Sequence, residues 1–302
     1  MYKSLSCDLL GISGRQSEII ELALTYGFRG IEIDMDDLVK RCQRSSFENA
    51  ARFLASSKLE IAGFDAPIDL DSDDETFSIR LAQLNAVAEI ASRASAKTAI
   101  VAIPHGTNRL PYPEYFDVVR NRIDQIAEVF AKENVRVALT FHVHAPDSEE
   151  KQFKFVRDVE GFSAVVRACS STNVAILYDS WNWFVGGGSF EQLEQIGLAR
   201  VAGLRLSDCA EGVTAEAATS DDCLLPGLGG TIENASVLQK FAEAELKLPV
   251  AARGSILEES PTRDAMVAAA QDSLDKVFEA AGIPSETRRP EMFAEASYSR
   301  SY

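Results

Sequence analysis

The chain alternates between short apolar runs and longer stretches in which apolar residues recur every three or four positions. The short runs are rich in Val, Ile and Leu and predict strands, and the spaced stretches predict amphipathic helices. In the stretch 115–132, for example, Ile123, Ile126, Ala127 and Phe130 share one helical face. The predicted strands are 5–10, 28–34, 59–65, 98–104, 135–142, 174–180, 201–208 and 249–256. The predicted helices are 17–26, 47–56, 75–94, 115–132, 155–169, 190–196, 234–246 and 263–281.

Strand and helix alternate eight times without a linker, and this order favours a parallel sheet covered by helices. We predict an α/β fold with one (β/α)8 barrel domain over residues 1–283, and an open, doubly wound sheet is the alternative. Residues 284–302 form a C-terminal tail with Pro, Arg and spaced aromatic residues. Two interpretations of the tail stay open: it packs on its own barrel, or it grips a neighbouring subunit.

Alternation along a strand separates side chains that face the barrel interior from those that face the helices. In the strand 135–142, the bulky Val137, Leu139 and Phe141 belong under the helices, so Thr140 and His142 point inward. The same rule places these residues inside the other strands: Gly30, Glu32 and Asp34; Leu177, Asp179 and Trp181; Gly203, Arg205 and Ser207; Ala251, Arg253 and Ser255.

The inward polar residues fall near the C-terminal ends of their strands, where barrel enzymes place their chemistry. One interpretation is purely structural: Glu32, Asp179, Arg205 and Arg253 satisfy one another as an internal lattice of ion pairs. The other interpretation is a ligand site, which we favour because burying several charges is costly and because this end of a barrel is its functional face.

Charge and cysteine content narrow the range of partners and compartments. The net charge of −16 argues against DNA or RNA, because nucleic-acid binding depends on cationic contacts to phosphates. No apolar run approaches the roughly 18 residues of a membrane helix, and the N-terminus lacks the apolar core of a signal peptide. The five cysteines are scattered and form no C-x-x-C pair, so we expect a cytoplasmic protein without disulfides.

Several other residues are candidates with two interpretations each. His142 is a general acid or base, or a hydrogen-bonded rim residue. His105 is a mouth residue or an ordinary loop residue, and Trp181 stacks on a ligand or fills the barrel top. The glycine-rich loops 186–188 and 225–231 are weak phosphate cradles, of which 225–231 is the better candidate. We expect Cys7 and Cys209 to be inert thiols.

The chain resembles the xylose-isomerase-like TIM barrel superfamily, which contains sugar-phosphate isomerases and epimerases and a class of apurinic endonucleases. The resemblance spans nearly the whole chain and rests on several moderately specific segments. They are ALTYGFRGIEID at 23–34, RLPYPEYFDVVRNRIDQIAEVFAKENVRVALT at 109–140, ILYDSWNWFVGGG at 176–188, LRLSD at 204–208 and LPGLGGTI at 225–232. It implies the same barrel and isomerase or epimerase chemistry, while the presence of only three His residues makes the endonuclease branch a poor match.

The resemblance also implies one divalent metal, held by a carboxylate, an Asp, a His and a Glu on the fifth to eighth strands. The matching positions here are Thr140, Asp179, Arg205 and Arg253, and Asn182 stands where a further His is often found. A guanidinium about 5 Å from a dication repels it by about 6–7 kcal/mol at an effective dielectric constant near 20. We therefore expect no metal in the usual place.

Two other arrangements stay open at these positions. Arg205 and Arg253 can clamp a carboxylate or phosphate with bidentate hydrogen bonds. Alternatively, an unconventional zinc or manganese site forms from Asp179, His142 and Glu32, with Asp34 as a substitute for Glu32.

We expect a metal-independent isomerase or epimerase, or else a lyase, acting on a small hydroxylated and anionic ligand. Asp179, Glu32 or His142 is then the base, and Arg205 with Arg253 stabilises an enediolate. The candidate ligand-binding residues are Arg205, Arg253, Trp181, Asn182, Thr140 and His105. The alternative is a non-catalytic descendant that binds a ligand or partner. An open pocket with one group of raised pKa would favour the enzyme, and a pocket plugged by its own Arg–Asp pairs would favour the non-catalytic descendant. We expect a small-molecule partner, no nucleic acid and no membrane, and leave a homo-oligomer open.

Overall fold

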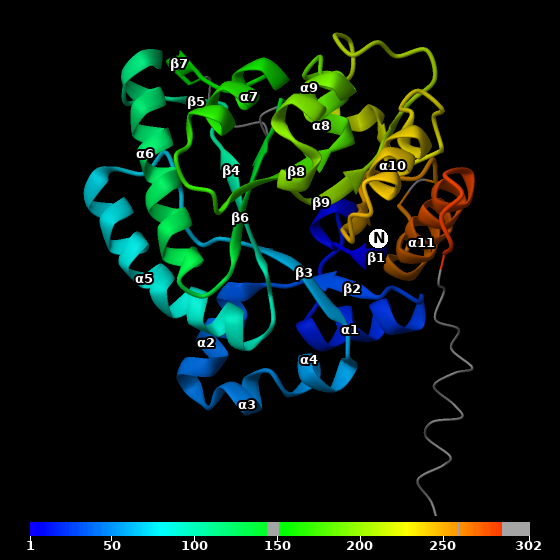
Figure 1. The fold of residues 1–302 in the computed structure, drawn as a ribbon. Coiled ribbons are helices and arrows are strands. Elements are labelled where there is room, and N and C mark those ends of the chain that lie inside the picture. The colour runs from blue at the N-terminus through cyan, green and yellow to red at the C-terminus, as the bar shows by residue number, and fades with distance from the viewer. Residues whose placement is uncertain (144–150, 259, 286–302) are drawn as a thin grey trace, which may run out of the picture.

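Eight parallel strands close into a barrel in the computed structural model, which describes residues 1–143, 151–258 and 260–285 (Figure 1). The barrel order is β1-β12-β9-β8-β6-β4-β3-β2, so β1 pairs with both β2 and β12 and closes the ring. The strands are β1 (Tyr2–Leu5), β2 (Gly30–Glu32), β3 (Glu60–Asp65), β4 (Thr98–Ile103), β6 (Arg136–Phe141), β8 (Val174–Asp179), β9 (Val201–Leu206) and β12 (Pro249–Ala252). The predicted (β/α)8 barrel is confirmed.

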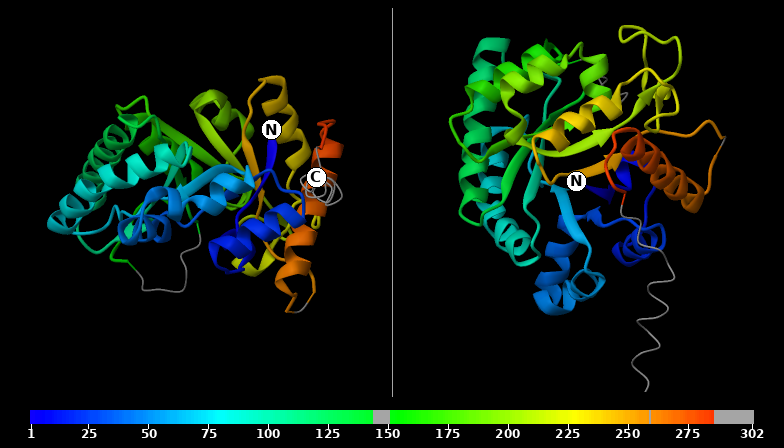
Figure 2. Two further views of the ribbon diagram at one scale, coloured as in Figure 1. Left: turned by 90° about the horizontal axis from the view of Figure 1, so that it is seen from below. Right: turned by 45° about the vertical axis from the view of Figure 1, so that its right-hand side comes forward.

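The helices lie outside the strands and wrap the barrel (Figures 1 and 2). They are α1 (Gln16–Thr25), α2 (Met35–Arg44), α3 (Phe47–Ala50), α4 (Arg52–Ser57), α5 (Asp74–Arg93), α6 (Tyr112–Ala131), α7 (Val159–Ala168), α8 (Ser180–Val185), α9 (Phe190–Ile196), α10 (Asn234–Glu243) and α11 (Arg263–Ala280). Two short antiparallel pairs sit in the loops: β5 (Gly106–Thr107) with β7 (Phe153–Lys154), and β10 (Asp208–Cys209) with β11 (Cys223–Leu224).

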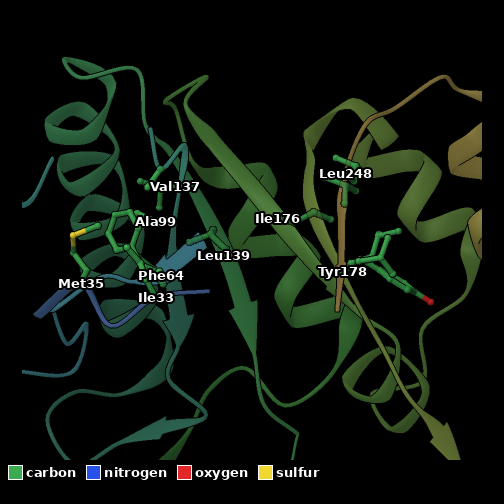
Figure 3. Close-up of a cluster of buried hydrophobic side chains, with 14 of the residues drawn as sticks. Ile33, Met35, Phe64, Ala99, Val137, Leu139, Ile176, Tyr178 and Leu248 are labelled. Atoms are coloured by element: carbon green, nitrogen blue, oxygen red, sulfur yellow. The ribbon is translucent and has the colours of Figure 1, made fainter. Parts of the chain in front are cut away.

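Two apolar layers separate along the barrel wall, as alternation along the strands predicts. Val137 and Leu139 belong to the large core between strands and helices, and Figure 3 shows them with Ile176 and Tyr178. The side chains that point into the barrel form a separate small cluster of Ile100, Ala138, Ala175, Leu177 and Ala202. Small residues and glycines on the inner face leave room for the polar side chains above them.

The predicted first strand and the predicted inward position of Asp34 are wrong. β1 ends at Leu5, and residues 8–10 form a 3-10 turn that Gly11 ends at a φ of 64°. Asp34 starts α2, a helix that the strand and helix pattern missed, and its side chain accepts a hydrogen bond from Asp37 N at 2.9 Å. Asp34 is the N-cap of α2, so the chain passes from strand to helix between Glu32 and Met35.

The C-terminal region follows α11 along the outside of the barrel. Ser285, the last described residue, lies beside Lys3 and Asp275, so the chain is fixed to the barrel wall up to that point. The rest of the predicted tail, 286–302, lies outside the described residues. Within the described part of the chain, every helix is too short or too polar to cross a membrane.

Candidate functional site

A cavity of about 920 Å³ opens at the C-terminal ends of the barrel strands. Its walls come from the ends of β2, β3, β6, β9 and β12 and from the loops that follow β1, β3 and β9. The polar and aromatic lining residues are Ser6, Asp8, Glu32, Asp65, Asp69, Thr140, His142, Trp181, Arg205, Ser220, Asp221, Cys223, Arg253 and Ser255. The cavity is therefore open. Asp179 and Ser207 do not line it, whereas these residues predicted to point inward do: Glu32, Thr140, His142, Trp181, Arg205, Arg253 and Ser255.

Two arginine–carboxylate pairs form its floor. Arg205 Nη2 donates to both carboxylate oxygens of Glu32, at 3.1 and 3.2 Å, and Ser6 Oγ donates to the same carboxylate at 2.6 Å. Arg253 Nη1 donates to Asp179 Oδ2 at 2.5 Å. These are charge-assisted hydrogen bonds in a buried setting, so each guanidinium neutralises one carboxylate.

Asp179 has a second role at the start of α8. Its Oδ1 accepts from Asn182 N at 3.0 Å, which makes it the N-cap of that helix. The side chain is only 2% exposed and does not line the cavity, so Arg253 separates it from the open space. Of the internal ion pairs considered from the sequence, two separate ones are present, Arg205–Glu32 and Arg253–Asp179, and they lie beneath an open cavity rather than filling it.

Four further carboxylates line the cavity: Asp8, Asp65, Asp69 and Asp221. None of them forms an ion pair with a Lys or Arg among the described residues. Since Glu32 and Asp179 already neutralise the two arginines, the walls carry an excess of negative charge. An anionic ligand would meet this field, and both guanidiniums among the described lining residues are already paired.

Asp65 and His142 have pKa values shifted in opposite directions. Burial raises the pKa of Asp65; Arg205 opposes that shift, and Glu32 and Asp8 add to it. The Asp65 side chain still reaches solvent through the mouth, although protein atoms surround most of it. Burial lowers the pKa of His142, and the nearby Arg253 and Arg205 lower it further, whereas Asp179 raises it. The imidazole is therefore neutral at physiological pH.

Three buried polar atoms near the floor have no hydrogen-bond partner among the described residues: Thr140 Oγ1, Arg205 Nε and Asn182 Nδ2. Thr140 and Arg205 line the cavity, and Asn182 does not. An unpaired buried donor or acceptor costs about 1–3 kcal/mol, so such atoms are expected where water or a ligand supplies the partner.

His105 does not line the cavity either. It lies between β4 and β5, where its carbonyl accepts from Phe155 N at 2.8 Å and its imidazole lies near Arg157 and Lys151. Trp181 lines the cavity but is 2% exposed and packs against Cys209, Ala218 and Cys223.

Both glycine-rich loops already use their N–H groups. Gly229, Gly230, Thr231 and Ile232 donate their backbone N–H groups to the buried Asp208 carboxylate at 2.6–3.0 Å. The N–H groups of residues 186–188 donate to carbonyls of α8. A carboxylate of the protein itself thus occupies the anion cradle of the loop 225–231, and neither loop offers these N–H groups to a phosphate.

A divalent metal needs several carboxylate, imidazole or thiolate ligands that converge on one point. Across residues 1–143, 151–258 and 260–285, no three His, Cys, Asp or Glu side chains are arranged to hold a metal ion, and Asp179, His142 and Glu32 are not such a group. Asp179 and Glu32 are each bound to a guanidinium, and Arg is not a metal ligand. These residues do not fit the metal that the family resemblance implies.

Sequence reasoning missed the four unpaired carboxylates and Ser6. Asp65 could have been found, because Phe64 belongs to the outer core and alternation then points Asp65 inward. Asp8, Asp69 and Asp221 lie in loops or short 3-10 turns, where no periodicity indicates direction.

Comparisons with known proteins agree with the barrel fold. A family model described as xylose isomerase-like TIM barrel matches residues 20–277. A xylose isomerase domain protein from Alicyclobacillus acidocaldarius has a similar structure, with a TM-score of 0.80 and 22% identity over 93% of this chain and 99% of that chain. The IOLI protein with a binding zinc atom has a TM-score of 0.72 and 17% identity, covering 93% of this chain and 98% of that one.

A more distant structural relative is D-psicose 3-epimerase with D-tagatose, from Clostridium cellulolyticum H10. It has a TM-score of 0.68 and 11% identity, covering 93% of this chain and 99% of that one. At these identities, the structural likenesses show the fold alone. No curated protein sequence matches the chain.

Proposed function

The chain belongs to the xylose isomerase-like TIM barrel family, and from that premise we propose that it is a metal-independent isomerase or epimerase of a small, neutral, hydroxylated molecule. The observation that carries the proposal is the open cavity of about 920 Å³ at the C-terminal mouth, lined by two titratable groups with opposite pKa shifts. Groups of this kind suit proton transfer next to a carbonyl, which the isomerisation of a hydroxy-carbonyl compound needs.

In this proposal, Asp65 and His142 exchange the protons. A carboxyl group with a raised pKa is a stronger base than an ordinary aspartate, and a neutral imidazole can accept a proton and, once protonated, return it. Arg253 lies at the cavity floor and stabilises the negative charge that develops on an enediolate oxygen. Asp179 and Glu32, expected from the sequence as bases, instead hold the two arginines in place.

We propose a neutral ligand in place of the anionic one expected from the sequence. Each arginine is already paired, the loop 225–231 binds the internal Asp208 carboxylate, and four unpaired carboxylates line the walls. Hydroxyl groups donate well to carboxylates, so a polyol or ketose suits these acidic walls better than a phosphate ester.

The proposal also excludes a resident divalent metal, because guanidiniums occupy the floor beside Asp179 and Glu32. Binding a dication there would require breaking both ion pairs and placing the metal beside two fixed positive charges.

A non-catalytic binding protein is the second candidate, and the two arginine–carboxylate pairs favour it because they remove the usual metal chemistry. Such a descendant would bind the same ligands without moving a proton. Measuring binding and proton transfer separately therefore distinguishes the two.

The test uses protein treated with a chelator and a panel of neutral ketoses, D-tagatose included, beside their phosphorylated forms. Neutral members should raise the melting temperature and exchange a carbon-bound hydrogen in D2O, followed by NMR. Asp65→Asn and His142→Gln should abolish exchange while the fold persists. Asp117→Asn, on an exposed turn of α6, is the matched control and should exchange like the parent protein.

Stabilisation by phosphorylated members alone would overturn the neutral-ligand proposal. Binding of neutral members without any exchange would leave the non-catalytic candidate.

A further inference from the structure

Cys209 and Cys223 lie directly opposite each other in the short antiparallel pair β10–β11. Ala210 N donates to Asp222 O at 3.2 Å, so the flanking residues, rather than the cysteines themselves, carry the ladder hydrogen bonds. In such a non-hydrogen-bonded pair the Cα atoms are about 4.5 Å apart and both side chains lie on one face. Disulfides span Cα distances of about 4.4–6.8 Å, so the register suits a cross-strand bond.

The two thiols also share one buried cluster with Trp181 and Ala218. Both cysteines are free, Cys209 is fully buried, and Cys223 is 7% exposed. Cys223 lines the cavity, as Arg253 does. A small oxidant entering the mouth therefore reaches Cys223 first, with Cys209 directly behind it as the resolving thiol.

We propose that Cys209 and Cys223 are a redox-modification site that closes reversibly into a disulfide at the edge of the ligand cavity. With hydrogen peroxide, the Cys223 thiolate attacks one peroxide oxygen and becomes a sulfenic acid, and one water leaves. The Cys209 thiolate then attacks the sulfenic sulfur, the S–S bond forms, and a second water leaves. Overall, the two thiols lose two protons and two electrons to one peroxide.

The site differs from a fast peroxide sensor. Burial raises the pKa of both thiols, that of Cys223 to about 12, so little thiolate exists at neutral pH. Oxidation is therefore slow at pH 7 and faster at higher pH. Closing the bond turns a thiol that lines the cavity into one half of a disulfide, so oxidation changes the cavity wall.

The experiment exposes the folded, full-length protein to hydrogen peroxide at pH 7 and pH 8.5 and follows its intact mass. The expected product has lost two hydrogen atoms, and digestion after acidic residues yields one disulfide-linked peptide pair containing Cys209 and Cys223. Dithiothreitol should restore the original mass. Cys209→Ser and Cys223→Ser should each prevent the loss, and Cys169→Ser, remote from the hairpin, should behave like the parent protein.

Three results would overturn the proposal: oxygen added to Cys223 without loss of hydrogen, a disulfide that uses other cysteines, or no oxidation of the folded protein at either pH. Because the readout is mass, the outcome does not depend on whether the cavity is catalytic. Oxidised glutathione serves as a second oxidant, and each disulfide formed should release two equivalents of glutathione.

Discussion

Single residues at the cavity floor hold more than one part of the structure together. Arg253 and Asp179 meet at the C-terminal end of the barrel, and Asp179 also caps α8. The pair holds the helix start, the guanidinium and the cavity floor in one arrangement. Removing either partner leaves a buried charge alone, and this penalty exceeds the intrinsic worth of most ion pairs.

Arg253→Ala is expected to destabilise the protein by about 3–5 kcal/mol at pH 7, because Asp179 remains buried without its partner. Urea unfolding monitored by circular dichroism measures the change. Adding Asp179→Asn to Arg253→Ala should restore part of the loss by removing the buried charge. Lys240→Ala, which breaks an exposed pair with Glu243, is the control and should cost no more than about 1 kcal/mol. If Arg253→Ala and Lys240→Ala lowered the free energy of unfolding equally, the buried pair would have no special weight and the account would be contradicted.

Asp65 is expected to make stability depend on pH. Its pKa is higher in the folded than in the unfolded chain, so its ionised form disfavours folding. The penalty is absent below the unfolded pKa near 3.9 and grows as pH rises through the folded pKa. Asp65→Asn should therefore raise the melting temperature at pH 7 and change it less at pH 4. A gain that is larger at pH 4 than at pH 7 would show that the shift has the opposite sign.

At the scale of elements, the loop after β9 is organised by one carboxylate. Asp208 accepts hydrogen bonds from its neighbour Cys209 and from four successive N–H groups at 229–232. Gly229 must lack a side chain there, since a Cβ would lie 1.7 Å from the Cys209 carbonyl oxygen. The loop is thus a filled anion cradle that fixes the wall beside the β10–β11 pair.

Asp208→Asn is expected to loosen this loop, because an amide nitrogen would face N–H donors that now point at an oxygen. Each donor left unsatisfied costs about 1–3 kcal/mol. Hydrogen exchange followed by mass spectrometry should show faster exchange at 229–232. Asp222→Asn, which alters only a surface cap on Thr219, should leave exchange at 229–232 unchanged. If the hydrogen-exchange rates at 229–232 were unchanged in Asp208→Asn, the Asp208 carboxylate would not be what organises this loop.

Strands and helices could be predicted from the sequence where the spacing of apolar residues was clear, and were missed or misplaced where it was weak or fitted both a strand and a helix. Six of the predicted strands contain the observed strand with at most two extra residues at either end, because alternation and apolar runs agree there. The exceptions are the first strand, displaced by the turn at 8–10, and the last, which ends at Ala252. α2 was missed because its sequence, MDDLVKRCQR, is largely polar, and α8 because its first residues continue an apolar strand.

The candidate site was predictable to the extent that side chains lie on strands. Alternation placed Glu32, Thr140, His142, Arg205 and Arg253 at one mouth, and all five line the cavity. It could not show that Arg253 covers Asp179, because pairing across the barrel depends on side-chain conformation. The acidic walls come mostly from loops, so the sequence suggested a more basic site than the structure has.

At the scale of the whole molecule, the barrel supplies a rigid rim on which the chemistry can change while the fold persists. The strands and helices are those of the xylose isomerase-like family, and resemblance to that family implies a metal site. In this cavity, however, two paired guanidiniums lie at the floor. The central claim is that two internal arginine–carboxylate pairs replace the metal and leave the cavity open.

The most direct test of that claim is the metal content of protein purified without added metal and without a metal-affinity tag, by elemental mass spectrometry. The account predicts far less than one equivalent of zinc, manganese or any other divalent transition metal per chain. Near-stoichiometric metal that survives dialysis, and is lost when Asp179 or His142 is replaced, would contradict it and return the site to metal-dependent isomerase chemistry.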